Sequence, residues 1–119
     1  MALLSQLELP GSPTEQAVAG ATTYYWDPTA ELATGETLSS PSAVVLEFDP
    51  RYPVDTKDVT STVVAAGSPF LGSGVNAGQV GITIPAGVLL AGYEYRVQLS
   101  VIASGGHTPA RYFRVRVNY

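Results

Sequence analysis

Two stretches near the end of the chain alternate between apolar and polar residues, and this period of two constrains the fold more than any other feature. In "YEYRVQLSVIAS" (93–104), the inward positions are Tyr95, Val97, Leu99 and Val101, and the outward ones are Glu94, Arg96, Gln98 and Ser100. In "RYFRVRVNY" (111–119), they are Phe113, Val115, Val117 and Tyr119 inward, and Tyr112, Arg114, Arg116 and Asn118 outward. Successive side chains of a strand point to opposite faces, so the pattern predicts two half-buried strands. The link "SGGHTP" predicts that they form an antiparallel hairpin.

The rest of the chain carries the same signature in shorter runs. Val, Ile, Thr, Tyr and Phe recur between turn-forming residues, and 12 glycines and 9 prolines supply those turns. No window shows a sustained helical period, and a length of 119 residues fits one domain. The sequence therefore predicts an all-β antiparallel sandwich of six to seven strands. The expected strands are residues 22–26, 42–49, 59–66, 79–85, 93–103 and 110–119.

The first 21 residues show no alternation. They contain four punctuating residues, Pro10, Gly11, Pro13 and Gly20, and four leucines, Leu3, Leu4, Leu7 and Leu9. We expect residues 1–21 to form an extended arm that precedes the sandwich of residues 22–119, with the leucines contacting a neighbouring subunit. The alternative is a first strand laid along the edge of the sandwich. The arm has neither a basic flank nor a long apolar run, so neither a signal peptide nor a membrane segment is expected.

The segment "LLAGYEY" leads into the first alternating strand. Leu90, Gly92 and Tyr95 have the L-x-G-x-x-Y spacing of the corner in immunoglobulin-like sandwiches, where the tyrosine hydroxyl bonds to backbone upstream. The alternative is that Tyr95 is simply a large core residue; both interpretations bury it. Cys is absent, so the immunoglobulin-like interpretation concerns architecture and not the disulfide of antibody domains.

Charge is distributed unevenly along the chain. Residues 94–119 carry four arginines against Glu94 alone, net plus three, and residues 1–93 carry two basic residues against nine acids, net minus seven, which together give the total of −4. This split suits polar docking between like subunits. Without a clustered basic loop, the acidic chain is not expected to bind nucleic acid. The lack of cysteine excludes thiol redox chemistry and thiolate metal sites.

Residues capable of catalysis or metal binding do not form a recognised pattern. His107 is the single histidine and lies in the Gly-Gly hairpin, with no cysteine and no G-x-S-x-G motif to form a nucleophile. The carboxylates Glu47, Asp49, Asp55 and Asp58 are interrupted by basic residues and match no known Ca²⁺ loop. We therefore expect no enzyme activity, no metal and no cofactor.

Three adjacent aromatic residues, Tyr24, Tyr25 and Trp26, precede an Asp-Pro turn. We expect at least one of them to lie in the core and another to be a docking anchor, because Tyr and Trp dominate interface hot spots. The alternative is that all three pack along an edge strand. Stacking on nucleic-acid bases is not expected, because the surrounding segment is acidic.

Three segments in order, "WDPTAELATGETLSS", "VGITIPAG" and "GYEYRVQLSVIASGGHTPARYFRVRV", resemble the small immunoglobulin-like virion proteins of tailed bacteriophages, in particular the fiber-tail adaptor family. The resemblance covers about residues 25–118. The matching residues are Asp27, Glu31, Gly35, Glu36, Thr37, Ser39, Tyr95, Val97, Gly105 and Gly106.

The resemblance implies a structural protein that links the tail or neck to fibers through subunit contacts, located in the virion and in the host cytoplasm during assembly. It implies other virion proteins as partners and a homo-oligomer within the particle; no membrane partner is expected. A capsid-decorating (cement) role stays open, as does a carbohydrate-binding or adhesion module of another class. The residues expected at subunit contacts are Leu3, Leu4, Leu7, Leu9, Tyr24, Tyr25, Trp26, Arg96, Arg114 and Arg116. Those expected to be structural are Tyr95, Val97, Leu99, Phe113 and Val115.

Overall fold

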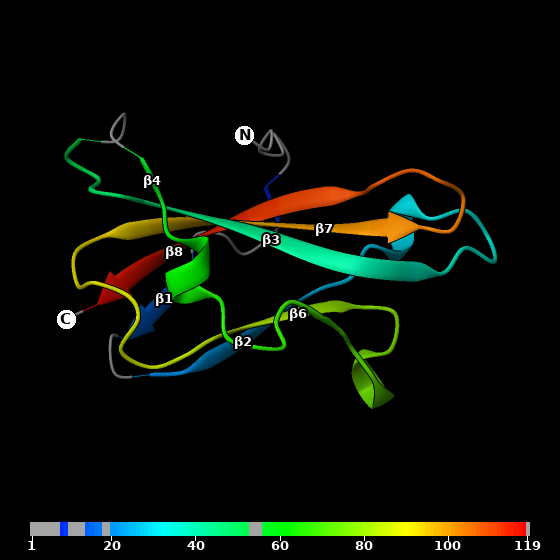
Figure 1. Ribbon diagram of the computed structural model, residues 1–119, viewed down its shortest axis with the longest axis horizontal. Helices are drawn as coiled ribbons and strands as arrows, with labels where there is room; N and C mark the ends of the chain where they lie inside the picture. The colour runs from blue at the N-terminus through cyan, green and yellow to red at the C-terminus, as the bar shows by residue number, and fades with distance from the viewer. Residues whose placement is uncertain (1–7, 10–13, 18–19, 53–55, 119) are drawn as a thin grey trace.

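The computed structural model describes residues 8–9, 14–17, 20–52 and 56–118 and places their strands in two sheets that face each other (Figure 1). One sheet has the order β1-β8-β7-β3-β4 and the other the order β2-β6-β5. The strands are β1 (Thr14–Ala17), β2 (Thr22–Trp26), β3 (Leu38–Phe48), β4 (Lys57–Asp58), β5 (Phe70–Leu71), β6 (Val80–Ile84), β7 (Glu94–Ala103) and β8 (Ala110–Asn118). The helical turns are η1 (Thr29–Glu31), α1 (Thr60–Val63) and η2 (Gly74–Asn76). The protein is thus a mostly-β domain with the layers of a β-sandwich.

Five of the six expected strands are confirmed, as β2, β3, β6, β7 and β8. The expected strand at residues 59–66 is wrong, because Thr60–Val63 form α1 instead. The Asp58 carboxylate accepts hydrogen bonds from both the backbone N–H and the hydroxyl of Thr60, which supports a turn at this point. The turn brings Val59 and Val63, four residues apart, into the core together.

The N-terminal segment contributes a strand that breaks the purely antiparallel pattern. β1 pairs parallel with β8, with Thr14 opposite Val115, whereas the other ladders are antiparallel. Upstream, the Leu9 N–H donates to the Tyr112 carbonyl at 2.8 Å. The division into an arm of residues 1–21 and a sandwich remains a prediction, although residues 14–17 of that arm lie in the sheet.

The core lies between the two sheets. One sheet contributes the inward residues of β7 and two residues of β8. They are Tyr95, Val97, Leu99 and Val101, with Phe113 and Val115. The opposite sheet contributes Trp26, Val80, Ile82 and Ile84. The polar face of β7 is more covered than the alternation predicted, because β7 lies between β3 and β8 in the sheet: Glu94 and Gln98 are also buried.

The Tyr95 hydroxyl makes the backbone hydrogen bond that the L-x-G-x-x-Y spacing predicted. It accepts from the Leu90 N–H at 2.9 Å and donates to Glu47 Oε2 at 2.6 Å. Burial, and secondarily the hydrogen bond to Glu47, raise the pKa of this phenol far above its usual value. The hydroxyl therefore stays protonated and ties β7, β3 and the preceding turn together.

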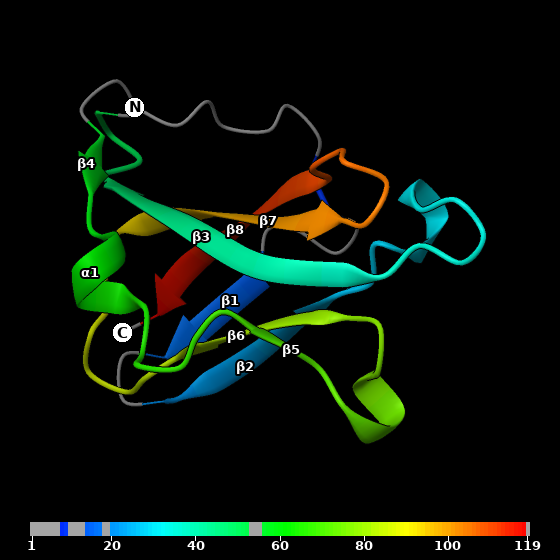
Figure 2. The ribbon, with the colours of Figure 1, turned by 45° about the vertical axis from the view of Figure 1, so that its right-hand side comes forward.

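Three connections gather at one end of the sandwich, on the right in Figure 2. They are residues 27–37 between β2 and β3, residues 72–79 between β5 and β6, and the β7–β8 hairpin at residues 104–109. In the described residues, no helix is long and apolar enough to cross a membrane.

Candidate interaction surfaces

The carboxylate of Glu36 joins two of the loops at this end. Its Oε1 accepts from the Ala33 N–H at 2.6 Å and from His107 Nε2 at 2.9 Å, and its Oε2 accepts from the Gly105 N–H at 2.8 Å. The Glu36 side chain is only 11 % exposed, although it lies among loops. The hydrogen bond from His107, followed by the one from the Ala33 amide, lowers the pKa of the Glu36 carboxyl. We call Glu36, Ala33, Gly105 and His107 the Glu36 clamp.

The glycine at position 105 is required by this clamp. A Cβ on Gly105 would lie 2.1 Å from Glu36 Oε2, far inside van der Waals contact. Gly35, which precedes Glu36, and Gly106, which follows Gly105, have φ angles of 85° and 98°, and such positive angles favour glycine. The segments "GET" and "SGGH", which are 67 or more residues apart, are therefore complementary parts of one loop junction.

We expect Glu36→Gln to weaken the loop junction in a pH-dependent way. A carboxyl whose folded pKa lies below its usual value of 4.5 stabilises the fold above that value, and this contribution is lost as the pH falls through the folded pKa. Thermal unfolding midpoints from pH 6 down to about pH 3 should therefore converge between wild type and variant on the acid side. A constant difference between the two across that range contradicts this role for the Glu36 carboxylate.

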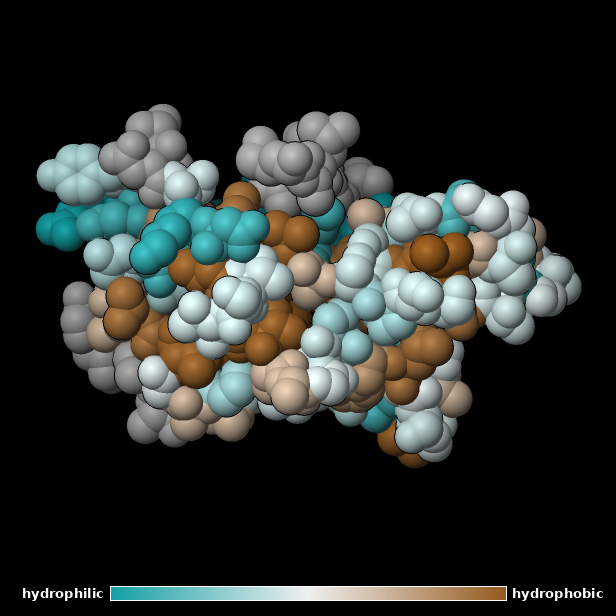
Figure 3. Space-filling view, viewed as in Figure 1, coloured by the Kyte–Doolittle hydropathy of each residue, from teal (hydrophilic) through white to brown (hydrophobic). Residues whose placement is uncertain are grey.

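A cleft of about 560 Å³ opens beside the clamp, between the β2–β3 connection and the β5–β6 connection. Leu32, Leu38 and Leu71 give it apolar walls, and Thr29, Thr37 and Gln79 lie among its polar lining residues. Figure 3 shows apolar surface around α1 and a smaller group toward this loop end. Its volume exceeds the roughly 460 Å³ of a second cleft, beside Leu46 and Phe48.

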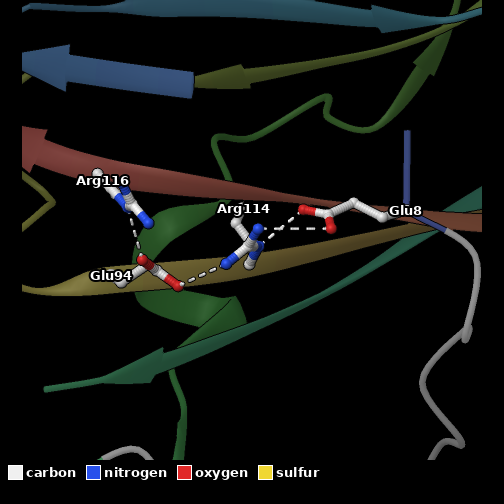
Figure 4. Close-up of polar contacts among 4 residues, drawn as sticks. All are labelled: Glu8, Glu94, Arg114 and Arg116. Carbon is white, nitrogen blue, oxygen red and sulfur yellow. Dashed lines mark hydrogen bonds and ion pairs between the residues drawn. The ribbon is translucent and has the colours of Figure 1, made fainter. Parts of the chain in front are cut away.

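A row of charges crosses the outer face of β7 and β8 (Figure 4). Glu94, whose side chain is 7 % exposed, contacts Arg116 at 3.0 Å and Arg114 at 3.8 Å. Arg114 in turn contacts Glu8 at 2.7 Å. Pairing of a nearly buried carboxylate with two guanidinium groups offsets its desolvation cost. Glu8 thereby attaches the segment before β1 to the sheet.

Ion pairs within one molecule therefore join acids of the N-terminal part of the chain to arginines of β8. Arg111 also pairs with an acid from the N-terminal part, Glu31, at 2.8 Å. Some of the unevenly distributed charges are therefore paired within the fold. The docking of like subunits through opposite charges remains a prediction.

Arg96 differs from the other arginines of this face. In the described part of the chain it makes no ion pair, and its guanidinium lies 4.0 Å from the centre of the Tyr112 ring, a cation–π contact. It lines a second cleft of about 460 Å³ together with Leu46 and Phe48. Three arginines were expected at contacts, Arg96, Arg114 and Arg116. Among the described residues, Arg96 alone of the three has no carboxylate partner, and its positive charge lies beside apolar side chains of the cleft.

The aromatic trio divides between the two faces of β2. Trp26 lies in the core, and Tyr24 packs on Phe113 with ring centres 4.9 Å apart and donates its hydroxyl to Gln16 at 2.8 Å. Tyr25 points to the outer face and is 43 % exposed. The expectation that at least one of the three lies in the core is confirmed by Trp26. The docking role remains a prediction.

Tyr25 forms an edge-to-face pair with Phe70 across Gly81. The ring centres are 6.0 Å apart, and a Cβ on Gly81 would lie 2.6 Å from Phe70. Next to this pair, the hydroxyls of Thr23 and Thr83 are 2.9 Å apart. The outer face of the smaller sheet therefore presents aromatic surface beside hydroxyl groups.

The remaining predicted residues are dispersed. Leu9 packs against the core, while Leu3, Leu4, Leu7 and Asp55 lie outside the described residues. Asp49 pairs with Arg51, and the Asp58 carboxylate accepts from the Thr60 N–H. Among described residues, no three His, Cys, Asp or Glu side chains gather as for a metal ion. Sequence reasoning assigned no role to Phe70, because its contact with Tyr25 depends on the glycine between them.

Comparisons with protein-family models, with curated proteins and with solved structures find no match for this chain.

Proposed function

We propose that this protein is an immunoglobulin-like structural subunit of a tailed-bacteriophage virion that links the tail or neck to fibers through its surfaces. The strand orders support the immunoglobulin-like part. With β2, β6 and β5 as strands B, E and D, and β3, β7 and β8 as C, F and G, the two sheets correspond to the BED and GFC sheets of that fold. The Tyr95 corner lies at the start of strand F, as this assignment requires.

The Glu36 clamp is the single observation that carries the proposal. The resemblance to fiber-tail adaptors depends on short motifs, among them Gly35, Glu36 and Thr37 and the hairpin glycines. These motifs meet in the fold, since Glu36 accepts from the Gly105 N–H and Thr37 N–H donates to Ser104. Motifs that together build one junction support a shared architecture better than motifs scattered over the surface.

Surface composition supports assembly as the function. Charged residues make up 13 % of the chain, and three of the four arginines of β7 and β8 are paired within the molecule. Burying such a surface against a neighbour has a modest desolvation cost, and interface cores are depleted in charge.

Locating the chain in particles tests this proposal. Particles purified from cells that express the chain in its native genetic setting should contain it in fixed stoichiometry. Averaged images should show about six or twelve copies arranged as a symmetric ring at the tail vertex. Hundreds of copies over the shell would instead establish the cement role, and absence from the particles contradicts a virion function.

A carbohydrate-binding function is the second candidate, favoured by the exposed Tyr25–Phe70 pair beside the Thr23 and Thr83 hydroxyls. On a glycan array, this function predicts selective binding that Tyr25→Ala abolishes. Tyr52→Ala is the matched control, because Tyr52 is also an exposed tyrosine and lies in the connection after β3. If the wild-type protein binds no glycan on the array, this candidate function is contradicted.

A further inference from the structure

The strand β2 is an edge strand whose outer side is unpaired in the described chain. It pairs with β6 on one side and has no other neighbour in its sheet. The other edge strands are shorter: β5 of the same sheet has two residues, and β1 and β4 of the larger sheet have four and two. β2 has five residues and is the longest edge strand among those described.

The backbone groups that face this open edge belong to Thr23 and Tyr25. In an antiparallel ladder, the N–H and C=O of one residue point to the same side, and the side alternates along the strand. The Thr83 N–H donates to the Ser68 hydroxyl, and the Gln79 carbonyl accepts from the Gly72 N–H, both on the β5 side of β6. Val80, Ile82 and Ile84 therefore bond to β2.

The partners of those three residues in the register are Trp26, Tyr24 and Thr22. Thr23 and Tyr25 alternate with them, so their N–H and C=O groups point away from the sheet. Both residues are exposed to solvent. The edge thus offers two donors and two acceptors in strand geometry.

Nothing within β2 protects it against pairing with another strand. Edge strands are usually blunted by charge, by proline, by a bulge or by shortness. The sequence "TTYYW" contains no charge and no proline, and its ladder with β6 runs without a bulge. Its threonine and aromatic residues have high strand propensity.

We infer that β2 pairs antiparallel with β2 of a second copy of this chain and joins the two three-stranded sheets into one continuous sheet. A two-fold axis at Tyr24 places Thr23 of each copy opposite Tyr25 of the other, which satisfies all the outward groups of both residues with backbone hydrogen bonds. Tyrosine opposite threonine is a favourable cross-strand pair. The contact is isologous and closes at two copies.

A second copy fits this edge because the pairing is self-complementary. The nearest charged residue along the chain, Asp27, falls opposite Ala21 in this register, so no like charges face each other. Gln16 is buried, with its amide bonded to the Tyr24 hydroxyl and to Gly20, so no unpaired polar side chain has to be desolvated there. This inference depends on the edge itself and not on the virion role.

The experiment measures the mass of the full chain by sedimentation over a concentration series. Wild type should shift from monomer to dimer, and Thr23→Pro should remain monomeric. Proline removes an N–H that the β2–β6 ladder does not use, and proline is tolerated on edge strands. Thr23→Val is the matched control: it keeps the β-branched shape and the N–H, and should still form a dimer.

Hydrogen exchange gives a second readout that does not depend on a variant. The Thr23 and Tyr25 amides should exchange rapidly in dilute protein and slow several-fold as the dimer forms, whereas the Tyr24 amide should be protected throughout. A wild-type chain that stays monomeric up to about 1 mM overturns the inference, since that is the weak end of specific affinity. A dimer in which the Thr23 and Tyr25 amides stay unprotected also overturns it, because another surface then holds the copies together.

Discussion

Leu99→Ala should lower the free energy of unfolding by about 2 to 4 kcal/mol. Leu99 is 0 % exposed in the middle of β7, where it belongs to the core cluster between the two sheets. β7 is held by ladders to β3 and to β8 on its two sides, so the backbone cannot move in to fill the cavity. Urea denaturation monitored by circular dichroism measures the change, with an unchanged slope confirming that the unfolded state is comparable.

Ile102→Ala is the control for this substitution. Ile102 is an aliphatic residue of the same strand, but it is 44 % exposed on the opposite face. Its truncation should change the unfolding free energy by no more than about 0.5 kcal/mol. A larger loss for Ile102→Ala than for Leu99→Ala contradicts the assignment of the faces of β7.

Tyr95→Phe should lower the free energy of unfolding by about 1 to 3 kcal/mol, although it removes a single oxygen. The hydroxyl is the hydrogen-bond partner of both the Leu90 N–H and Glu47 Oε2, and Tyr95 is 0 % exposed. Its loss leaves a buried donor and a carboxylate oxygen without that partner, and unsatisfied buried groups retain their full desolvation cost. Chemical denaturation of both proteins at neutral pH measures the difference.

Tyr52→Phe tests whether the effect comes from the buried hydroxyl. Tyr52 is 61 % exposed, so its hydroxyl can bond to water in the folded and the unfolded protein alike. We expect no measurable change in its denaturation midpoint. Equal midpoints for Tyr95→Phe and wild type would mean that Tyr95 contributes only its ring to the core.

The strands that the sequence predicted correctly are those with a strong local pattern. The alternation in β7 and β8 reports burial of one face, and the residues that it assigns to the inward face are buried in the fold: Tyr95, Val97, Leu99, Phe113 and Val115. The corner hydrogen bond was also predictable, because the L-x-G-x-x-Y spacing is local.

The prediction for residues 59–66 was wrong because the composition of this segment is ambiguous. Val and Thr favour strands. Here, however, the Asp58 carboxylate accepts from the Thr60 N–H, which favours a turn, and the two buried valines are four residues apart. The turn-forming tendency of Asp58, whose carboxylate bonds the backbone two residues on, was the signal that could have indicated a turn here.

The Glu36 clamp and the Tyr25–Phe70 pair could not be derived from periodicity. Glu36 and His107 are separated by 71 residues, and Tyr25 meets Phe70 only because Gly81 lies between them on a third strand. The resemblance singled out Glu36 and Gly105 as motif residues, but their contact depends on how the loops converge at one end of the sandwich.

The inward residues of β7 and β8 could be assigned without the fold, because side-chain alternation is a property of a single strand. Three features depend on the tertiary structure: β1 runs parallel beside β8, Glu8 and Glu31 neutralise arginines of the last strand, and β2 has no second neighbour among the described strands. Strand neighbours and charge partners far apart in the chain are chosen by the packing of the two sheets, which minimises exposed apolar surface over the whole domain. That choice leaves no trace in local sequence.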